Sequence, residues 1–287
     1  MSSKQFINIE KIIQPTLAPL PVLRGEALEH INTIQHGYIN VDNGRITEVG
    51  TMSKFQPNGG EVIDLSGKWV LPGWVDSHTH TVFATYRAGE FEMRLQGATY
   101  QEIAQAGGGI LNSANKLAHL DEETLFNEAI TRIEKIIAKG TVGLEIKSGY
   151  GLSGSQEIKM LRVIHRLKSV CPIPIKSTFL GAHAIPLEYK NKRRDYLDLI
   201  IDRLLPQIAE QNLADYCDVF CETGYFSASE AEEIIVASAS LGIPSKIHTN
   251  QFTSIGGIAT AVKHEIKSVD HLEVMTQQDI ELLGASK

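Results

Sequence analysis

Six strand-like runs alternate with helix-like segments from residue 74 onward, and this alternation restricts the fold more than any other feature of the sequence. The runs are WVDSHTH (74–80), TVGLEIKSG (141–149), IKSTFLGAH (175–183), YCDVFCE (216–222), PSKIHTN (244–250) and KSVDHLE (267–273). The segment 121–140 is the clearest helix, because its apolar residues form one stripe between a predicted N-cap, Asp121, and a glycine stop, Gly140. Strand–helix alternation is typical of a parallel sheet, either a (β/α)8 barrel or a doubly wound sheet.

The residues that end these runs distinguish the two architectures. A barrel draws its functional groups from the C-terminal ends of several strands, whereas a dinucleotide-binding sheet concentrates its signal in one glycine-rich turn after the first strand. Here nearly every run ends in, or just before, a chemically capable residue, namely His80, Tyr150, His183, Glu222, His248 and His271. The glycine cluster AGGGI at 106–110 follows no strand and lacks the G-x-G-x-x-G spacing. We therefore predict an α/β fold of the (β/α)8 TIM-barrel type, with only six βα units in this chain.

The N-terminal part of the chain has a different pattern. Residues 1–70 read as short strands broken by turns, and DNG in HGYINVDNGRITEVG (36–50) predicts a β-hairpin. We therefore predict two domains, residues 1–70 and a barrel over 71–287 that is incomplete at its C-terminus. Because six strands are two fewer than a closed barrel has, we expect a truncated or partial version of a longer protein, or a gap covered by another chain.

Composition excludes several classes of partner. The net charge is −7 without a Lys/Arg-rich block, so nucleic acid is not an expected partner. The sequence contains neither an apolar run near the roughly 18–20 residues of a membrane span nor a signal-peptide core at its start, so no membrane association is expected. The three cysteines, Cys171, Cys217 and Cys221, fit a reducing compartment, and we predict a cytoplasmic protein.

Two histidines with one residue between them end the first run. On a strand His78 and His80 point to the same side, although such a pair also arises by chance and could be two ordinary hydrogen-bonded histidines. Their position at a strand end favours a metal site, and His248 ends the fifth run at the same edge of the sheet. Imidazole suits Zn²⁺ and Fe. We predict one divalent ion on His78, His80 and His248, with Asp76 as a brace for the ligands.

These residues also carry a family resemblance. LPGWVDSHTH (71–80) resembles the start of the barrel in the amidohydrolase superfamily of metal-dependent hydrolases. The chain is similar to the imidazolonepropionase family in EFEMRLQG (90–97), YQEIAQAGGGI (100–110), EIKSGYGL (145–152), TFLGAHAIP (178–186), DVFCETGYF (218–226) and SVDHLE (268–273). GYINVDNGRITEVG (37–50) resembles the strand pair of the superfamily's small β-sandwich, so the resemblance implies that residues 1–70 are the N-terminal strands of a composite β-sandwich.

The resemblance implies a reaction and a set of substrate contacts. The reaction is hydrolysis of a cyclic amide C–N bond in histidine degradation, in which 4-imidazolone-5-propanoate and water give N-formimidoyl-L-glutamate. The resemblance assigns Arg87 to the propionate, with Arg94 as a reserve candidate, because a guanidinium fork binds carboxylates well. It assigns further substrate contacts to Tyr150, to His183, which could also polarise a developing oxyanion as a catalytic group, and to Gln251.

The acid/base group follows from what Gln251 cannot do. Some relatives carry a glutamate at this position, proposed as a proton shuttle, and a glutamine cannot usefully accept a proton. His271, beside Asp270 in VDHLE, is then the best acid/base candidate in the chain, because an imidazole pKa near 6.5 suits that work.

The chain departs from the family at its end. The family's metal shell includes an aspartate near the last barrel strand, beyond Lys287. We therefore expect these 287 residues alone to fold poorly and to turn over little or no substrate. A related amidohydrolase or deaminase with another substrate, and an inactive truncated remnant, remain open alternatives. The resemblance also suggests a homodimer.

Overall fold

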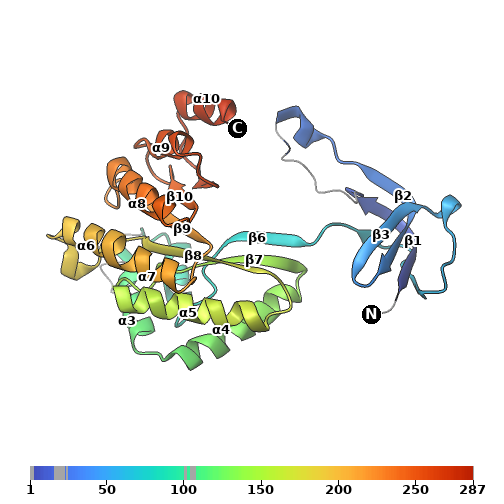
Figure 1. Ribbon diagram of the computed structural model, residues 1–287, viewed down its shortest axis with the longest axis horizontal. Helices are drawn as coiled ribbons and strands as arrows, with labels where there is room; N and C mark the ends of the chain where they lie inside the picture. Colours follow the sequence, from blue (N-terminus) through green and yellow to red (C-terminus); the bar gives the residue numbers. More distant parts are fainter. Residues whose placement is uncertain (1–2, 16–22, 24, 100–101, 104–107, 287) are drawn as a thin grey trace. The chain divides into compact units, whose positions relative to one another are not determined.

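Residues 3–15, 23, 25–99, 102–103 and 108–286 are described by a computed structural model. The chain divides into two units, Met1–Gly73 and Trp74–Lys287 (Figure 1). Of the motif YQEIAQAGGGI, residues 100–101 and 104–107 lie outside the described residues, so part of that sequence prediction has no structural counterpart here.

The described part of the first unit forms a five-stranded sheet in the order β3-β2-β1-β4, with β5 also paired to β1. Its elements are β1 (Lys4–Ile13), η1 (Gly25–Glu29), β2 (Thr33–Asp42), β3 (Arg45–Thr51), η2 (Met52–Lys54), β4 (Glu61–Asp64) and β5 (Trp69–Val70). The predicted hairpin is confirmed: β2 and β3 are antiparallel, and Asn43 and Gly44 between them have φ angles of 51° and 77°, as a two-residue type I′ turn requires. Ile9, Ile12 and Ile39 form its small buried core.

The second unit contains a parallel sheet in the order β11-β10-β9-β8-β7-β6. The strands are β6 (Trp74–Thr79), β7 (Thr141–Lys147), β8 (Ile175–Ala182), β9 (Tyr216–Cys221), β10 (Ser245–Thr249) and β11 (Val269–His271). Each of the six predicted strand runs is therefore a strand.

This parallel sheet is curled. In a flat sheet, the two edge strands β6 and β11 would be about 24 Å apart, since neighbouring strands are about 4.8 Å apart. Instead, His78 Nδ1 on β6 lies 3.0 Å from Asp270 Oδ2 on β11. The sheet thus forms a half-barrel that brings side chains from its first and last strands to one place.

Helical segments alternate with the strands along the chain (Figure 1). They are α1 (Ala88–Leu95), α3 (Ile110–Ala118), α4 (Glu122–Ile137), α5 (Gly154–Val170), η3 (Leu187–Tyr189), α6 (Arg193–Leu199), the π-helical turn η4 (Ile200–Leu204), α7 (Leu205–Glu210), α8 (Ala228–Ser240), α9 (Gly257–Lys263) and α10 (Gln277–Ala285). Of these, α4, α5, α8 and α9 pack against strands of the sheet.

Helix α4 shows why the sequence pattern produces this arrangement. Asp121 is its N-cap, as predicted, and Asp121 Oδ1 accepts a hydrogen bond from the Thr124 amide at 2.7 Å. Leu125, Ala129 and Ile133 on the predicted stripe are fully buried in the main core. Gly140, with a φ angle of 97°, ends the turn that leads into β7.

Candidate active site

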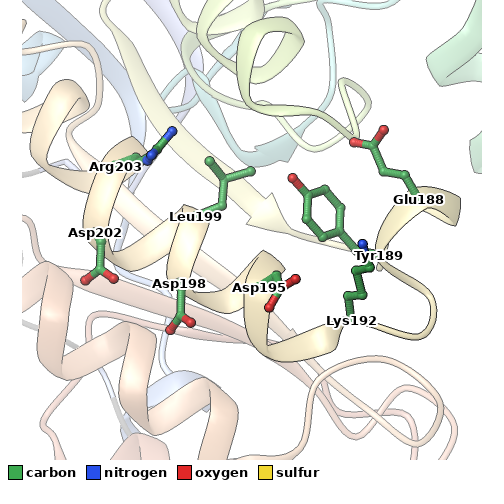
Figure 2. A pocket seen from close by; sticks show the side chains of 8 residues that line it. All are labelled: Glu188, Tyr189, Lys192, Asp195, Asp198, Leu199, Asp202 and Arg203. Atoms are coloured by element: carbon green, nitrogen blue, oxygen red, sulfur yellow. The ribbon is translucent and has the colours of Figure 1, made fainter.

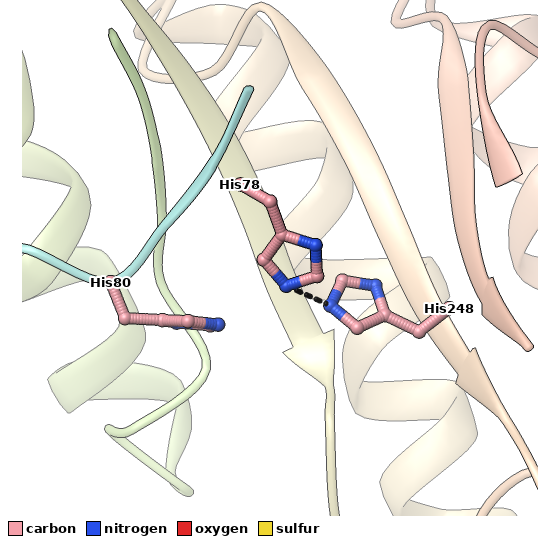
Figure 3. A group of neighbouring side chains, drawn as sticks. All are labelled: His78, His80 and His248. Atoms are coloured by element: carbon pink, nitrogen blue, oxygen red, sulfur yellow. Dashed lines mark hydrogen bonds between the residues drawn. The ribbon is translucent and has the colours of Figure 1, made fainter. Parts of the chain in front are cut away.

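Three imidazoles meet at the open end of the curled sheet. His78 is near the end of β6, His80 follows it, and His248 is in β10. One ring nitrogen of each lies within 4.8 Å of the others, and the Nε2 atoms of His78 and His248 are 3.0 Å apart. Figure 3 shows the ring of His80 pointing toward the other two. The sheet therefore brings together the three residues that the sequence indicates as metal ligands.

Each of the three rings uses its Nδ1 atom to contact the protein. The partners are Asp270 Oδ2 for His78 at 3.0 Å, the Ser148 carbonyl for His80 at 3.1 Å, and Asp218 Oδ1 for His248 at 3.0 Å. Carbonyl and carboxylate oxygens accept hydrogen bonds, so in His80 and His248 Nδ1 carries the proton and Nε2 keeps a lone pair, whereas His78 Nδ1 makes an ion-pair contact with Asp270. This tautomer is the one in which histidine binds a metal through Nε2.

The donor set fits a divalent ion. Two nitrogens that are each about 2.0–2.1 Å from one ion lie about 2.9–3.4 Å apart at ordinary coordination angles. The separation of 3.0 Å between His78 Nε2 and His248 Nε2 falls in this range. The two atoms also lie at hydrogen-bond distance, so one ring nitrogen can donate to the other, and a cation between them would replace that hydrogen bond. The three residues could therefore hold one metal ion, and three imidazoles suit Zn²⁺ or Fe.

The surroundings keep two histidines of this region, His80 and His183, neutral. Burial, and then the neighbouring histidines, hold the pKa of His80 well below its usual value of 6.5. Burial lowers the pKa of His183 to about 4. Neutral imidazole is the form that binds metal or accepts a hydrogen bond, so these rings are in their useful state at neutral pH.

Beneath the histidines lies a buried charged network. Lys147, which is 0% exposed, has its Nζ 2.8 Å from Glu145 Oε1, 2.7 Å from Asp218 Oδ2 and 3.2 Å from Asp270 Oδ2. Glu145 and Lys147 therefore form an interior ion pair, and Lys246 also pairs with Glu145.

This network orients two of the three candidate ligands. Burial alone would raise the pKa of Asp218, but His248 and Lys147 hold this pKa well below its usual range. Asp218 and Asp270 thus stay ionised beside His248 and His78, and Lys147 compensates the negative charge of both carboxylates.

The predicted substrate contacts lie beside this centre. A hollow of about 200 Å³ is lined by residues that include His80, Arg87 and Tyr150. A second one of about 190 Å³ shares Arg87 and Tyr150 and adds residues that include His183 and Gln251. The ring of His183 stacks on that of His80 with centroids 5.6 Å apart, and Tyr150 lies 4.9 Å from His80 by the same measure.

The remaining candidates fall in different places. The ring of His271 lies 5.5 Å from that of His78 and 5.2 Å from that of His248, so it faces the same centre. The reserve candidate Arg94 is exposed on α1 and lines neither hollow. Asp76 is exposed, and its carboxylate accepts a hydrogen bond from the His78 amide at 3.3 Å.

Sequence reasoning did not identify Asp218 as a residue that supports the site. It also missed the contacts of Lys147 with carboxylates on other strands. Asp218 and Lys147 are charged residues in the otherwise largely apolar strands YCDVFC and TVGLEIK, and this pattern indicates that they have partners in the core. A charge in a buried strand requires a partner, because burying it alone is costly. The partners come from different strands, so the sequence does not identify them.

A larger hollow of about 700 Å³ lies elsewhere, along η3, α6 and η4 (Figure 2). Its described lining contains neither histidine nor cysteine, and its polar groups are Glu188, Tyr189, Lys192, Asp195, Asp198, Asp202 and Arg203. It brings together no set of neutral donors comparable to the three imidazoles, and it is not a candidate site for this chemistry.

No helix in the described ranges combines the length and the apolar character that crossing a membrane requires.

No protein-family model matches the sequence. Curated relatives do match it. An imidazolonepropionase of Flavobacterium psychrophilum is 49% identical over 98% of this chain and 69% of its own length. Those of Flavobacterium johnsoniae and Christiangramia forsetii are 47% and 44% identical, each over 98% of this chain and 68% of their own length. The chain spans about two thirds of these relatives.

Solved structures support the fold. A guanine deaminase from C. acetobutylicum with bound guanine matches with a TM-score of 0.64 at 13% identity, over 98% of this chain and 65% of that one. An uncharacterised metal-dependent hydrolase from Pyrococcus furiosus matches with a TM-score of 0.60 at 13% identity, over 98% and 75%. At this identity the likeness shows the fold alone. The prediction of an α/β fold of the TIM-barrel type, six βα units of which lie in this chain, is confirmed.

Proposed function

Because the chain belongs to the imidazolonepropionase family, we propose that it carries the metal and substrate sites of an enzyme that hydrolyses the C–N bond of a cyclic amide. The substrate is 4-imidazolone-5-propanoate, and the product is N-formimidoyl-L-glutamate. The observation that carries this proposal is the convergence of His78, His80 and His248 beside a hollow that contains Arg87.

The three imidazoles hold one divalent ion, Zn or Fe. When bound, such an ion supplies Lewis-acid activation of water at neutral pH. The protein's part is to present three Nε2 atoms to the ion, and Asp270, the Ser148 carbonyl and Asp218 orient the rings by contacting their Nδ1 atoms.

Arg87 binds the propionate of the substrate. Its Nη1 lies 3.5 Å from Glu90 Oε2, which is long for a hydrogen bond, so this contact leaves the guanidinium able to take a carboxylate. Its Cζ lies 5.9 Å from the centroid of the Tyr150 ring. Tyr150 and Gln251 line the same hollow, where they contact the imidazolone ring by packing and hydrogen bonding.

His183 acts on the substrate ring as a hydrogen-bond acceptor. Its Nδ1 lies 2.9 Å from the Gly149 carbonyl, so Nδ1 carries the proton and Nε2 keeps a lone pair. We assign this Nε2 to a ring N–H of the substrate. Polarising an oxyanion would require a protonated ring, which a pKa near 4 disfavours.

His271 is the acid/base group. Its Nδ1 lies 3.2 Å from Glu273 Oε1, which leaves Nε2 to take a proton from water and later return it to the departing nitrogen. Burial lowers the pKa of His271 below 6.5, so the ring begins in its basic form at neutral pH. Gln251 remains a binding residue in this scheme.

Three further assignments belong to this proposal. Residues 1–70 contribute the N-terminal strands of a composite β-sandwich, and residues 71–287 contribute the barrel. The enzyme acts in the cytoplasm, in keeping with three free cysteines, and it assembles as a homodimer. Sedimentation equilibrium of the purified chain tests the last assignment, and a monomer at all concentrations contradicts it.

The decisive experiment separates binding from turnover. The chain matches about two thirds of the relatives' length. That these 287 residues alone fold poorly and hydrolyse little substrate therefore stays a prediction.

The purified chain is loaded with Zn²⁺ or Fe²⁺ and titrated with imidazole-4-propionate, a stable analogue of the substrate, in a calorimeter. We expect binding that requires the metal, together with slow loss of imidazolone-propionate absorbance. Metal-dependent release of ammonia from a panel of cytosine, guanine and adenine, without analogue binding, would overturn the assignment in favour of a deaminase.

A further inference from the structure

Glu157 is a fully buried carboxylate for which the proposed reaction has no use. It lies in the first turn of α5 and is 0% exposed. Its Oε1 accepts hydrogen bonds from the Gly151 amide at 2.6 Å and the Leu152 amide at 3.2 Å, and its Oε2 accepts one from the Gly149 amide at 2.9 Å. The Ser148 hydroxyl is a fourth donor. Burial raises the pKa of Glu157, and these four donors oppose that rise because they favour the ionised carboxylate.

The segment that these donors belong to, residues 148–152, has a constrained backbone. Gly149 has a φ angle of 103°, and Leu152 has one of 48°, which a leucine seldom adopts. A Cβ atom on Gly151 would lie 2.5 Å from the Glu157 amide nitrogen, so only glycine fits there. The carboxylate compensates for this strain, because it satisfies three amides that the tight turn leaves without sheet or helix partners.

The opposite side of the same segment contacts the candidate site. The Ser148 carbonyl lies 3.1 Å from His80 Nδ1, and the Gly149 carbonyl lies 2.9 Å from His183 Nδ1. The Ser148 carbonyl and the Gly149 amide belong to one planar peptide group. A hydrogen bond that fixes the amide on one side therefore also fixes the direction of the carbonyl on the other.

We propose that Glu157 is a positioning residue that orients His80 for metal binding through the peptide group between Ser148 and Gly149. His80 then has a carboxylate behind it, as His78 and His248 have, but one peptide group away. The negative charge on Glu157 polarises the intervening peptide and makes the Ser148 carbonyl a better acceptor for the His80 proton. The inference rests on the proposed function and adds a residue to it.

The test is the Zn²⁺ dissociation constant of the folded full chain, measured by competition with a chromogenic chelator. Glu157→Gln keeps the size of the side chain but replaces one of its two accepting oxygens with an NH2 group. That group faces at least one backbone N–H of residues 148–152, so a hydrogen bond is replaced by repulsion between two donors. We expect the dissociation constant to rise about tenfold, the lower end of the effect usual for groups behind a metal-binding histidine. A variant that is folded and binds Zn²⁺ as the wild type does overturns the inference.

A matched control separates positioning from general destabilisation. Asp215 precedes β9 at the other end of the sheet, and it accepts hydrogen bonds from Lys168 at 2.7 Å, Lys176 at 3.0 Å and the Ser177 amide at 2.8 Å. Asp215→Asn removes a comparable set of interactions. We expect it to lower the melting temperature while changing the Zn²⁺ dissociation constant less than twofold. An equal loss of Zn²⁺ affinity in both variants overturns the inference.

A measurement on the wild type decides the matter if Glu157→Gln does not fold. Coupling between two groups is reciprocal, so Zn²⁺ on His80 should slow hydrogen exchange of the amides of Gly149, Gly151 and Leu152 several-fold. Exchange at these amides that is unchanged by Zn²⁺, in a chain that binds the ion, overturns the inference. A wild-type chain that binds no Zn²⁺ overturns the proposed function itself, so the two failures are distinguishable.

Discussion

His248 Nδ1 lies 3.0 Å from Asp218 Oδ1, and the other oxygen of that carboxylate lies 2.7 Å from Lys147 Nζ. Both oxygens of Asp218 are therefore engaged, one by the candidate metal ligand and one by a buried cation. A carboxylate held in this way fixes both the tautomer and the orientation of the imidazole.

Asp218→Asn tests this relationship. With the amide oxygen of the substituted side chain toward His248, the amide NH2 group faces the Lys147 ammonium and repels it. With the oxygen toward Lys147, the NH2 group faces the His248 N–H instead. His248 therefore loses its hydrogen-bond acceptor in a part of the molecules. We expect Zn²⁺ to bind about 10–100-fold more weakly, measured by chelator competition. Unchanged affinity in a folded variant would show that His248 needs no support from Asp218.

Lys147→Met should destabilise the fold strongly. It leaves Glu145, Asp218 and Asp270 as close carboxylates without their common cation, and breaking a buried pair from one side typically costs about 3–5 kcal/mol. Urea unfolding measures the loss. Adding Asp218→Asn to Lys147→Met should recover part of it, because a negative charge leaves together with the positive one.

Lys176→Met is the matched control for the lysine. Lys176 pairs with Asp215, but its side chain is 58% exposed, and an exposed pair is worth about 1 kcal/mol or less. If Lys147→Met costs no more than this control, the buried network does not stabilise the fold.

The metal-free chain should lose stability between about pH 6.5 and pH 4. The folded state keeps His183 neutral down to a pKa of about 4, whereas an unfolded histidine takes up a proton near 6.5. The unfolded state therefore binds more protons in this window, and stability falls as the pH falls through it. A pKa depressed from 6.5 to about 4 corresponds to about 3 kcal/mol at most, because the ring is still partly exposed.

Urea unfolding at a series of pH values checks this dependence. His80, whose pKa burial also depresses, contributes in the same direction, so His183→Gln should remove only part of the slope. Below about pH 4, protonation of Asp218 and Asp270 should cause a further loss, since their pKa values lie below the usual range in the folded state. Stability that is flat from pH 7 to pH 4 would contradict the burial of neutral histidines.

Arg87→Met should weaken binding of a propionate-bearing imidazole about tenfold or more, because a charge-assisted, bidentate contact is lost. Titration calorimetry with imidazole-4-propionate measures it. Arg94→Met, in an exposed arginine on the same segment, should leave that affinity unchanged. Equal effects of the two substitutions would remove Arg87 from the substrate site.

The sequence was sufficient for the half-barrel and for the residues that it gathers. Strand runs with helical segments between them predicted β6 to β11, and strand-end histidines predicted which side chains would converge. What it left out depends on neighbours in space. Asp218 is the one charged residue in the strand YCDVFC, and only the pairing of the strands in space shows that Lys147 and His248 are its partners. Glu157 looks like an ordinary first-turn acid of a helix. Its role depends on a preceding turn whose φ angles the sequence does not reveal.

The most direct test of the central claim is metal stoichiometry. The purified chain is freed of metal with a chelator, titrated with Zn²⁺ and analysed for bound ion, beside His78→Ala and His248→Ala. One ion per chain in the wild type, and less than a tenth of that in either variant at the same free Zn²⁺, is the predicted result. A wild type that binds no ion, or variants that retain full occupancy, would contradict the convergence of three imidazoles on one cation.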